Sequence, residues 1–342
     1  MRQLVFEGAG TLRWDDVPEP ELTGGDAIVR PDAVALCDLD TGALAGIAPL
    51  PGPYHFGHEF AGTVVAVADD VTSARPGDRV VVPFQISCGQ CPPCQKGHTS
   101  NCTTVPKLSS FGLGPIGGHD WGGALADVVR VPFAQHMLVP LPDDVSFEAA
   151  ANAGDNLADA HRTVGPHLQA NPGAEVLVIG GGGPSIGLWA AELAVRLGSS
   201  RVRYVDTDPT RLRLAEEGGA EPYEGEPPTR GGRFPITVDA GGTPEGLRAA
   251  LLSTAPDGVC TSSSVFWEDV PFPLLNLYST NVTFSTGRVH SRGALPTVLG
   301  LLRDGVIDPT RIAQFVDWDD IPDGLVDAAA RMPKVIARRA PS

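Results

Sequence analysis

Residues 176–206, VLVIGGGGPSIGLWAAELAVRLGSSRVRYVD, decide the fold of this chain. They open with a four-residue apolar run, Val176–Ile179, of the kind that forms a buried parallel strand. Four consecutive glycines follow, and residues 188–197 are rich in Ala and Leu, which predicts a helix. Residues 202–205 predict a second strand, which ends at Asp206. Strand, glycine turn, helix, strand and acid is the order of a dinucleotide-binding βαβ unit.

The glycine turn is the candidate cofactor site. Glycines let the backbone approach a pyrophosphate, and the following helix N-terminus offers free N–H groups and a positive dipole end. The spacing is irregular, because Gly181-x-Gly183 followed by Gly187 fits the usual pattern only with one extra residue. A reading from Gly180 puts Ser185 at the third glycine position, and an ordinary βα loop is the alternative. The candidate cofactor-binding residues are Gly181, Gly183, Pro184, Ser185, Ile186 and Gly187.

The acid after the second strand predicts the kind of cofactor. Asp206 would accept hydrogen bonds from a ribose 2′-hydroxyl and repel a 2′-phosphate, so the sequence favours NAD over NADP. Arg211, five residues further on, could reach the same ribose, or it could be a solvated helix residue.

The length and charge of the chain limit which classes of protein it can belong to. A chain of 342 residues with 42% hydrophobic content suits two domains with apolar cores. The net charge of −16 repels phosphate backbones, which argues against a nucleic-acid partner. Residues 1–14 lack a basic region followed by an apolar core, and no apolar run reaches membrane-spanning length. We therefore expect a cytoplasmic protein with no membrane partner, in which cysteines bind metal before they form disulfides.

The order of predicted elements indicates two domains of different kind. Residues 1–150 read as short strands separated by turns, which predicts a partly open β-barrel or sandwich. Residues 151–291 alternate strand-like and helical runs, the pattern of a parallel α/β sheet. Residues 292–342 contain a predicted helix near 321–331 and a strand at 334–337, and we expect them to return to the first domain. The predicted fold class is α/β, with a β-rich domain and a doubly wound parallel sheet.

A lobe of four cysteines predicts one metal site. Cys88, Cys91, Cys94 and Cys102 follow the pattern C-x2-C-x2-C-x7-C. Four thiolates on one tight lobe can close a tetrahedron around Zn²⁺ with no open position, and such a site is structural. Disulfides are the competing interpretation, but four crowded cysteines in a chain without a leader favour zinc. His98 inside the loop could replace one thiolate, although an exposed loop histidine is the simpler reading.

A second metal site is indicated by residues outside the lobe. Cys37 stands apart, and 21 residues later comes Gly57-His58-Glu59 at the start of a predicted strand. One thiolate, one imidazole and one further anionic ligand would leave Zn²⁺ an open fourth position for substrate or water. Taken alone, a single cysteine and a single histidine are more often core residues. Cys260 lies in a predicted strand and is expected to be core.

Together these residues resemble the zinc-dependent alcohol dehydrogenases of the medium-chain dehydrogenase/reductase superfamily. The resemblance covers nearly the whole chain, and the segment Asp-Asn-Leu-Ala-Asp-Ala-His at 155–161 is most similar to the threonine dehydrogenase and glutathione-independent formaldehyde dehydrogenase branch. It also draws on the turn Pro76-Gly77-Asp78-Arg79-Val80. The resemblance implies a GroES-like catalytic domain from residues 1–150 and 292–342, and a Rossmann NAD-binding domain at 151–291. It further implies a homodimer or homotetramer joined through the Rossmann sheet.

The resemblance assigns roles around the catalytic zinc. Cys37, His58 and Asp155 match the three protein ligands of this branch. Glu59 matches a neighbour that can approach the metal, and Asp40 matches a residue that orients the histidine ligand.

Three more positions take their roles from the same resemblance. Phe84 matches an aromatic residue of the substrate pocket, and Trp121 either lines that pocket or is a buried structural residue. Asp159 falls where the family usually has a threonine near the nicotinamide.

One residue departs from the family pattern. Two positions after the zinc cysteine the family has Ser or Thr, whose hydroxyl relays the alcohol proton, and this chain has Leu39. Leucine carries no proton, so deprotonation would use Asp159, Asp38, Thr41 or water instead.

The sequence therefore predicts an enzyme, a zinc-dependent NAD(H) oxidoreductase that transfers hydride between nicotinamide and a small-molecule substrate, an alcohol, aldehyde or ketone, at a zinc-bound oxygen. The first alternative is a reductase of activated C=C or C=N bonds, which Leu39 makes more credible. The second alternative is a cofactor-binding protein without catalysis.

Overall fold

The computed structural model describes residues 1–340 and divides the chain into two compact units. The first unit comprises Met1–Ala158 and Val289–Ser342, and the second comprises Asp159–Arg288. Both ends of the chain thus belong to one unit, and the middle forms the other. Within the described residues no helix is long and apolar enough to cross a membrane.

The second unit is built on a six-stranded parallel sheet with the order β11-β10-β9-β12-β13-β14. Its strands are β9 (Val176–Ile179), β10 (Val202–Asp206), β11 (Glu221–Glu224), β12 (Phe234–Asp239), β13 (Thr254–Ser262) and β14 (Thr283–Thr286). Numbered along the chain, this order is 3-2-1-4-5-6, that of a doubly wound dinucleotide-binding sheet. Every residue of β9 is buried, which explains why its sequence is continuously apolar.

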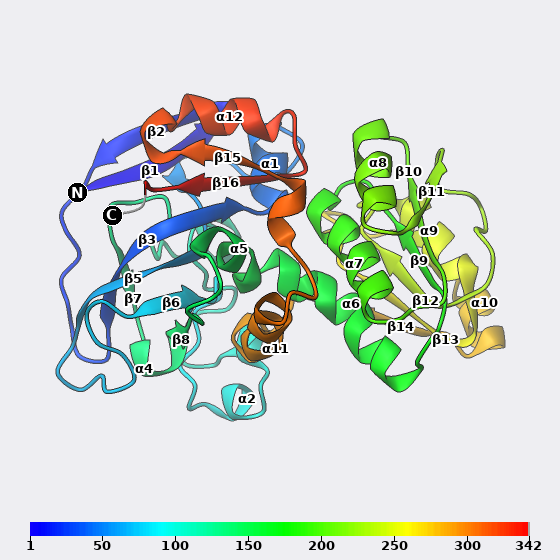
Figure 1. The fold of residues 1–342 in the computed structure, drawn as a ribbon, viewed down its shortest axis with the longest axis horizontal. Coiled ribbons are helices and arrows are strands. Elements are labelled where there is room, and N and C mark those ends of the chain that lie inside the picture. The colour runs from blue at the N-terminus through cyan, green and yellow to red at the C-terminus, as the bar shows by residue number, and fades with distance from the viewer. Residues whose placement is uncertain (341–342) are drawn as a thin grey trace. The chain divides into compact units, whose positions relative to one another are not determined.

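Helices cover both faces of this sheet. The helices are α6 (Asn156–Ala170), α7 (Pro184–Arg196), α8 (Pro209–Glu217), α9 (Pro244–Ser253) and α10 (Leu274–Thr280). In Figure 1, α7 and α8 lie on the near side of the sheet and α9 on the far side. A buried apolar cluster joins β9 and β13 to α9 and α10 through Leu177, Leu247, Cys260 and Leu277. Cys260 is therefore a core residue, as predicted.

The first unit contains a seven-stranded sheet, in which six strands have the order β15-β16-β3-β5-β6-β8 and the seventh, β7, pairs with β3. The strands are β3 (Ala27–Leu36), β5 (Glu59–Val67), β6 (Arg79–Val82), β7 (Val129–Val131), β8 (Val139–Pro140), β15 (Ala313–Asp317) and β16 (Lys334–Arg338). A smaller sheet has the order β2-β1-β4, formed by β1 (Arg2–Gly8), β2 (Thr11–Asp16) and β4 (Tyr54–His55). The C-terminal strand β16 runs antiparallel to β3, and Figure 1 shows the two side by side.

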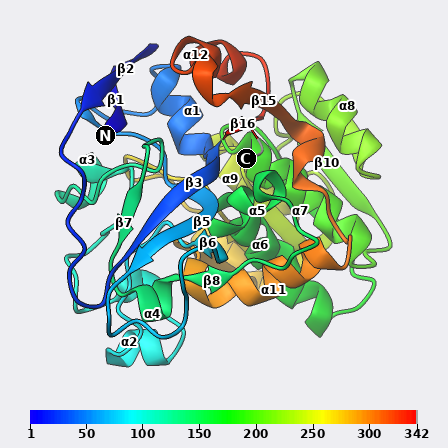
Figure 2. The ribbon, with the colours of Figure 1, turned by 60° about the vertical axis from the view of Figure 1, so that its left-hand side comes forward.

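Short helices connect the strands of the first unit. They are α1 (Asp38–Leu44), α2 (Pro92–Gln95), α3 (Gly114–Gly117), α4 (Ala134–Met137), α5 (Phe147–Ala151), α11 (Ser291–Arg303) and α12 (Asp323–Ala329). Figure 2 shows α2 of the cysteine lobe and α4 at the same lower end of the first unit, where Gly89 of the lobe approaches His136 of α4. Gly89 (φ +76°) is required at this contact, because an added Cβ would lie 2.6 Å from the ring of His136.

Some predicted boundaries differ from the observed ones. The strand predicted over residues 125–131 is limited to Val129–Val131, because Leu125 and Ala126 pair with β1 instead. The helix after the glycine turn begins at Pro184, since proline suits the first turn of a helix. Helix α10 was not predicted, because its sequence LLNLYST lacks a clear helical period.

Candidate active site

Four side chains from separate parts of the first unit converge on one point. Cys37 follows β3, and Asp155 follows a 3-10 turn at Asn152–Gly154. Glu59 is the first residue of β5, and His58 directly precedes it. One ligand-capable atom of each residue lies within 4.8 Å of the others. A thiolate, an imidazole and two carboxylates form a donor set that fits Zn²⁺.

The start of α1 fixes Cys37 and Asp40 relative to each other. The Asp40 backbone N–H donates to Cys37 Sγ at 3.3 Å, and the Cys37 backbone N–H donates to Asp40 Oδ2 at 3.1 Å. This reciprocal capping box orients the thiol sulfur and the carboxylate relative to each other.

Asp40 in turn faces the histidine. Its Oδ2 lies 3.5 Å from His58 Nδ1, and His58 Nε2 lies 3.3 Å from Asp155 Oδ2. A carboxylate beside Nδ1 favours the tautomer that leaves Nε2 free to bind a metal. The structure therefore brings Asp40 into the position that the resemblance implies.

The electrostatics of this cluster indicate that a cation belongs in it. Burial raises the pKa of the Cys37 thiol well above its usual value, and the nearby carboxylates of Asp40, Asp155 and Glu59 raise it further. Burial alone would lower the pKa of His58, but Asp40 and Asp155 raise it to about 9. Each shift reflects several anionic groups held close together in a dry site, and a divalent cation is the partner that neutralises them.

A buried ion pair lies next to the cluster. Lys334 Nζ, at the start of β16, donates to Glu59 Oε1 at 2.8 Å, and both residues are completely buried. Burial raises the pKa of Glu59 to about 8, even though Lys334 favours its charged form. Sequence reasoning did not find Lys334, although a lysine that opens an otherwise apolar strand is a usable signal.

Other neighbours of the cluster come from several elements. The ring centroids of Phe84 and His58 lie 5.4 Å apart, so the Phe84 ring borders the cluster. Ser291 Oγ, at the start of α11, donates to the carbonyl of Gly154, next to Asp155. The Tyr54 hydroxyl is buried without a hydrogen-bond partner among the described residues, and burial together with Asp40 and Cys37 raises its pKa. Neither Ser291 nor Tyr54 was predicted.

The four cysteines of the lobe also converge. Their sulfurs lie within 4.8 Å of one another, and all are free of disulfide bonds. Cys91 Sγ and Cys102 Sγ are 3.8 Å apart, about the separation that tetrahedral Zn–S bonds of about 2.3 Å require. His98 is outside this set, and its ring stacks on that of His290 at 5.1 Å. The cluster fits a structural zinc.

Backbone and hydroxyl donors surround these sulfurs. Cys88 Sγ accepts from the Cys91 backbone N–H at 3.3 Å and from Thr104 Oγ1 at 3.0 Å. A hydrogen bond from the Thr103 backbone, the largest contribution, lowers the pKa of Cys91 to about 5. Such donors favour the thiolate form that binds metal.

In the second unit the glycine turn lies between β9 and α7. The carbonyls of Gly241 and Ala240, after β12, accept from the N–H groups of Gly182 and Gly183 at 2.8 Å each. A Cβ at Gly180 would lie 2.4 Å from the Tyr204 hydroxyl and 2.5 Å from Asp206 Oδ2, so a larger residue there would displace these side chains. Helix α7 has Gly183 as its N-cap residue, and Pro184, Ser185, Ile186 and Gly187 form its first turn. The positive dipole end at a helix N-terminus attracts anions such as phosphate groups.

Asp206 ends β10 beside this turn and is tightly held. Arg211 donates to both of its oxygens, Nε to Oδ2 at 2.8 Å and a terminal nitrogen to Oδ1 at 2.7 Å. The hydroxyl of Tyr204 donates to Oδ2 at 2.8 Å. Burial opposes the charge of Asp206, but Arg211 and backbone donors hold its pKa below the usual value. Arg211 is thus a partner of Asp206 and not simply a solvated helix residue.

Two predicted residues are not among the four that converge. Asp159 belongs to the second unit, where it accepts from Arg162 Nε at 2.6 Å. Trp121 lines a surface hollow of the first unit together with His55, Asp120 and Arg130. Their predicted roles at the nicotinamide and in the substrate pocket remain predictions.

Comparisons with known proteins agree with this architecture. Residues 23–143 match the family of the alcohol dehydrogenase GroES-like domain. The chain is 30% identical over 340 residues to "Probable zinc-binding alcohol dehydrogenase Rv1895" of Mycobacterium tuberculosis, covering 97% of this chain and 86% of that protein. It is 30% identical to geraniol dehydrogenase of Castellaniella defragrans over 88% of this chain and 87% of that one. The structure of the alcohol dehydrogenase of Thermus sp. ATN1 is similar with a TM-score of 0.88, at 31% identity, over 99% of this chain and 100% of that chain.

The chain therefore belongs to the zinc-dependent medium-chain dehydrogenase/reductase family. Its class is that of the zinc-dependent alcohol and aldehyde oxidoreductases. The predicted family and the predicted fold class, a GroES-like domain with a Rossmann sheet, are confirmed.

Proposed function

We propose that this enzyme transfers hydride between NAD(H) and a small alcohol or its aldehyde or ketone, at a zinc ion held by Cys37, His58 and Asp155. The observation that carries the proposal is the convergence of these three residues and Glu59 within 4.8 Å. When bound, zinc supplies a Lewis acid that polarises the substrate oxygen. Three protein ligands are the number that leaves a zinc coordination position open.

The surrounding residues position the reaction. The capping box at Cys37 and the contact of Asp40 with His58 hold two ligands before metal binds. Phe84 beside His58 presents an apolar wall that excludes water and faces the carbon skeleton of a substrate. Leu39 offers no hydroxyl, and the Thr41 hydroxyl donates to the Asp38 carbonyl at 3.0 Å, so water is the proton carrier that this arrangement favours.

The proposed cofactor site is the glycine turn of the second unit. The positive dipole end at the start of α7 would face the pyrophosphate, and the pair formed by Asp206 and Arg211 would receive the adenosine ribose. The cofactor, when bound, supplies or accepts the hydride. The acid at position 206 supports NAD(H) as the cofactor.

In this proposal residues 1–150 and 292–342 form the catalytic domain and residues 151–291 the NAD-binding domain. The division of the chain into two units after Ala158 and before Val289 supports this assignment. We also assign the enzyme to the cytoplasm, on the basis of its six cysteines, all of which are free of disulfide bonds.

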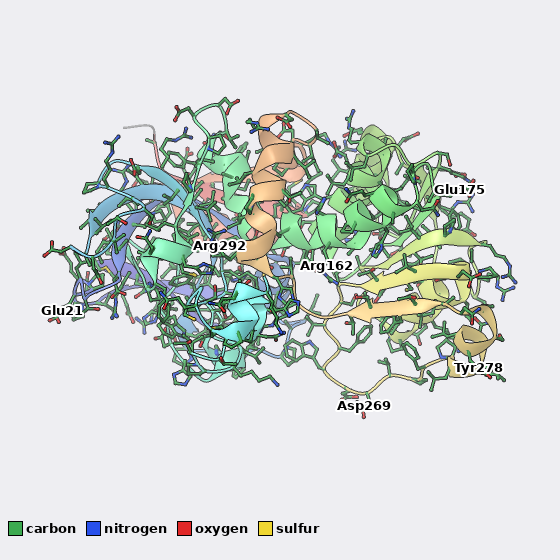
Figure 3. The ribbon with its side chains drawn as sticks, turned by 90° about the horizontal axis from the view of Figure 1, so that it is seen from below. Glu21, Arg162, Glu175, Asp269, Tyr278 and Arg292 are labelled. Atoms are coloured by element: carbon green, nitrogen blue, oxygen red, sulfur yellow. The ribbon has the colours of Figure 1, made fainter. Side chains whose placement is uncertain are left out.

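A homodimer or homotetramer is proposed from the edge of the second unit's sheet. Strand β14 ends the sheet order, and its backbone can pair with a second copy. Next to it α10 exposes large apolar residues, with Leu275 81% and Tyr278 84% exposed. Figure 3 shows Tyr278 at the periphery of the second unit. Light scattering of the wild type and of Leu275→Glu would test this interface, and an unchanged mass for the variant would contradict it.

Turnover of the His58→Ala variant tests the proposed chemistry. Oxidation of short primary and secondary alcohols and of geraniol with NAD, and reduction of the corresponding aldehydes with NADH, would be measured for the wild type and the variant. We expect turnover in the wild type, none in the variant, and the same NADH affinity in both by fluorescence titration. Full activity of His58→Ala would overturn the proposal, and lost NADH binding would show a general folding defect.

A further inference from the structure

The feature that reaches beyond the proposed function is the first turn of α11. Ser291, the first residue of this helix, has zero exposure. Its hydroxyl donates to the carbonyl of Gly154, and its backbone N–H donates to Gln85 Oε1 at 3.3 Å. Gly154 directly precedes the proposed metal ligand Asp155, and Gln85 directly follows Phe84, whose ring borders the cluster. One buried serine therefore contacts two segments that build the mixed cluster and its apolar border.

The hydrogen bond to the Gly154 carbonyl acts directly on the backbone of Asp155. The carbonyl group of residue 154 lies in one planar peptide unit with the N–H and Cα of residue 155. A hydroxyl that holds this carbonyl therefore fixes the plane from which the Asp155 side chain projects. Asp155 has φ −149° and ψ −88°, and it lies between the 3-10 turn at Asn152–Gly154 and α6. Since neither helix includes Asp155, contacts on its flanking peptides determine where its carboxylate points.

The cysteine lobe in turn holds the start of α11. Ser100 of the lobe presents its backbone N–H and its hydroxyl to His290 Nδ1, at 3.4 Å and 2.8 Å. The ring of His98 stacks on the ring of His290 with centroids 5.1 Å apart. An added Cβ at Gly293 would lie 3.3 Å from the carbonyl oxygen of Gly97, so the helix and the lobe are in close contact. All three lobe residues lie between its third and fourth cysteines, so the shape of the lobe determines the surface that α11 meets.

We propose that Ser291 is a positioning residue for the metal ligand Asp155, and that the cysteine lobe holds Ser291 in place through His290. The inference rests on the metal site of the proposed function. Groups that orient metal ligands typically contribute about 10- to 100-fold in metal affinity, because the ligands are then held in the binding geometry. The lobe thereby supports metal binding at the mixed cluster, although it supplies none of that cluster's donors.

A positioning role and a purely structural role differ in what the Ser291→Ala variant changes. Loss of a structural hydrogen bond lowers the melting temperature and leaves the mixed site unchanged below it. Loss of a positioning hydrogen bond also changes the geometry in which Asp155 binds the metal. Ser146→Ala is the matched control, because Ser146 Oγ accepts from the Ala149 N–H at 3.1 Å and caps α5, which directly precedes the 3-10 turn. This control removes a serine hydrogen bond of similar strength in the same stretch of chain.

The test uses the full-length chain with cobalt(II) in the metal sites. The variants are Ser291→Ala, His290→Phe, the double variant His290→Phe/Ser291→Ala and the control Ser146→Ala. His58→Ala identifies which phase of cobalt release and which visible absorption bands belong to the mixed site, since that variant lacks them. The rate of release to a chelator, the visible spectrum and the melting temperature are then measured for each protein.

We expect Ser291→Ala to release cobalt from the mixed site about tenfold faster than the wild type and to shift the absorption bands of that site. His290→Phe keeps an aromatic ring for His98 but loses the acceptor for Ser100, so release should be about threefold faster. The double variant should release no faster than Ser291→Ala alone, because His290 acts through Ser291. Ser146→Ala should have the wild-type release rate and spectrum despite a lower melting temperature.

Three outcomes would overturn the inference, and they have different meanings. Wild-type release and spectrum in Ser291→Ala, or equal changes in Ser146→Ala, would make Ser291 a purely structural residue, while the proposed function stands. Wild-type release in His290→Phe, or additive effects in the double variant, would overturn the link to the lobe. A wild-type chain without any metal phase that depends on His58 would overturn the proposed function and this inference with it.

Discussion

The two metal-capable clusters of this protein are built in opposite ways. The cysteine lobe takes all four donors from residues 88–102, and its sulfurs are oriented by neighbouring backbone N–H groups. The mixed cluster collects Cys37, His58, Glu59 and Asp155 from distant segments and adds Lys334 from the last strand. The lobe depends on local chain geometry and is chemically uniform, whereas the mixed cluster depends on the finished fold and contains donors of unequal strength. This difference suits a closed structural site and an exchangeable reactive one.

The largest expected effect separates the two clusters directly. Cys91→Ser removes one thiolate of the lobe and should abolish metal binding there, because the serine hydroxyl stays protonated. Apparent binding free energies of structural zinc are about 10–16 kcal/mol, so the melting temperature should fall steeply. Calorimetry and elemental analysis would measure both effects. Retention of the lobe's zinc in this variant would contradict the structural assignment.

A smaller effect is expected from Asp40→Asn in the mixed cluster. The amide keeps the shape but loses the negative charge that faces His58 Nδ1 at 3.5 Å. Metal affinity at the mixed cluster should fall by about 10- to 100-fold, while the lobe is unaffected. Competition with a chelator of known affinity gives the measurement, and Asp38→Asn is a matched control in the same helix. Equal losses in both variants would mean that Asp40 acts only on the stability of α1.

The nucleotide site, like the cysteine lobe, is built from residues close together in the sequence. The Asp206→Ser variant tests this site. The exchange removes the carboxylate that Arg211 and Tyr204 hold in place and frees the guanidinium for a phosphate. We expect the preference for NAD over NADP to fall by roughly tenfold, the size of one charged hydrogen bond. Ratios of kcat/KM for the two cofactors would show this change. An unchanged ratio would place the ribose elsewhere.

Acid unfolding tests the same carboxylate by a different route. The pKa of Asp206 is lower in the folded chain than its usual value of 3.8, so the folded state favours the charged form. The pair therefore stabilises the fold above pH 4, and this contribution disappears as the pH falls through the folded pKa. Wild type should lose more stability than Asp206→Asn between pH 5 and pH 2 (about the window in which a buried carboxylate pair protonates). Parallel acid curves for the two proteins would contradict the prediction.

The smallest effect is expected at Leu39. Leu39→Ser restores a hydroxyl two residues after Cys37, where a proton relay would stand. Alcohol oxidation should rise a few-fold if proton transfer limits turnover, with little change in aldehyde reduction at low pH. The solvent isotope effect on kcat should fall at the same time. A faster enzyme with an unchanged isotope effect would point to pocket shape instead.

Local patterns gave the most reliable sequence predictions. The run at Val176–Ile179, the glycine turn and the acid at 206 lie within one βαβ unit, and the structure has this unit with the predicted order of elements. The lobe was equally readable, because the spacing of its cysteines already limits where the sulfurs can lie.

Long-range contacts could not be predicted in the same way. Lys334 contacts Glu59 only because β16 pairs with β3, and the sequence near residue 59 does not indicate that a lysine is its partner. The burial of the Tyr54 hydroxyl likewise depends on side-chain packing between distant segments. The ligands of the mixed cluster can be predicted only from the family resemblance, because the spacing between Cys37 and His58 does not by itself define a metal site.

The most direct test of the account is the number of zinc ions per chain, measured by elemental mass spectrometry on protein purified without added metal. We predict two ions in the wild type, one in Cys91→Ser and one in His58→Ala, each variant losing the ion of its own cluster. A wild-type chain with a single zinc that disappears in Cys91→Ser and persists in His58→Ala would contradict the account, because the mixed cluster would then bind no metal.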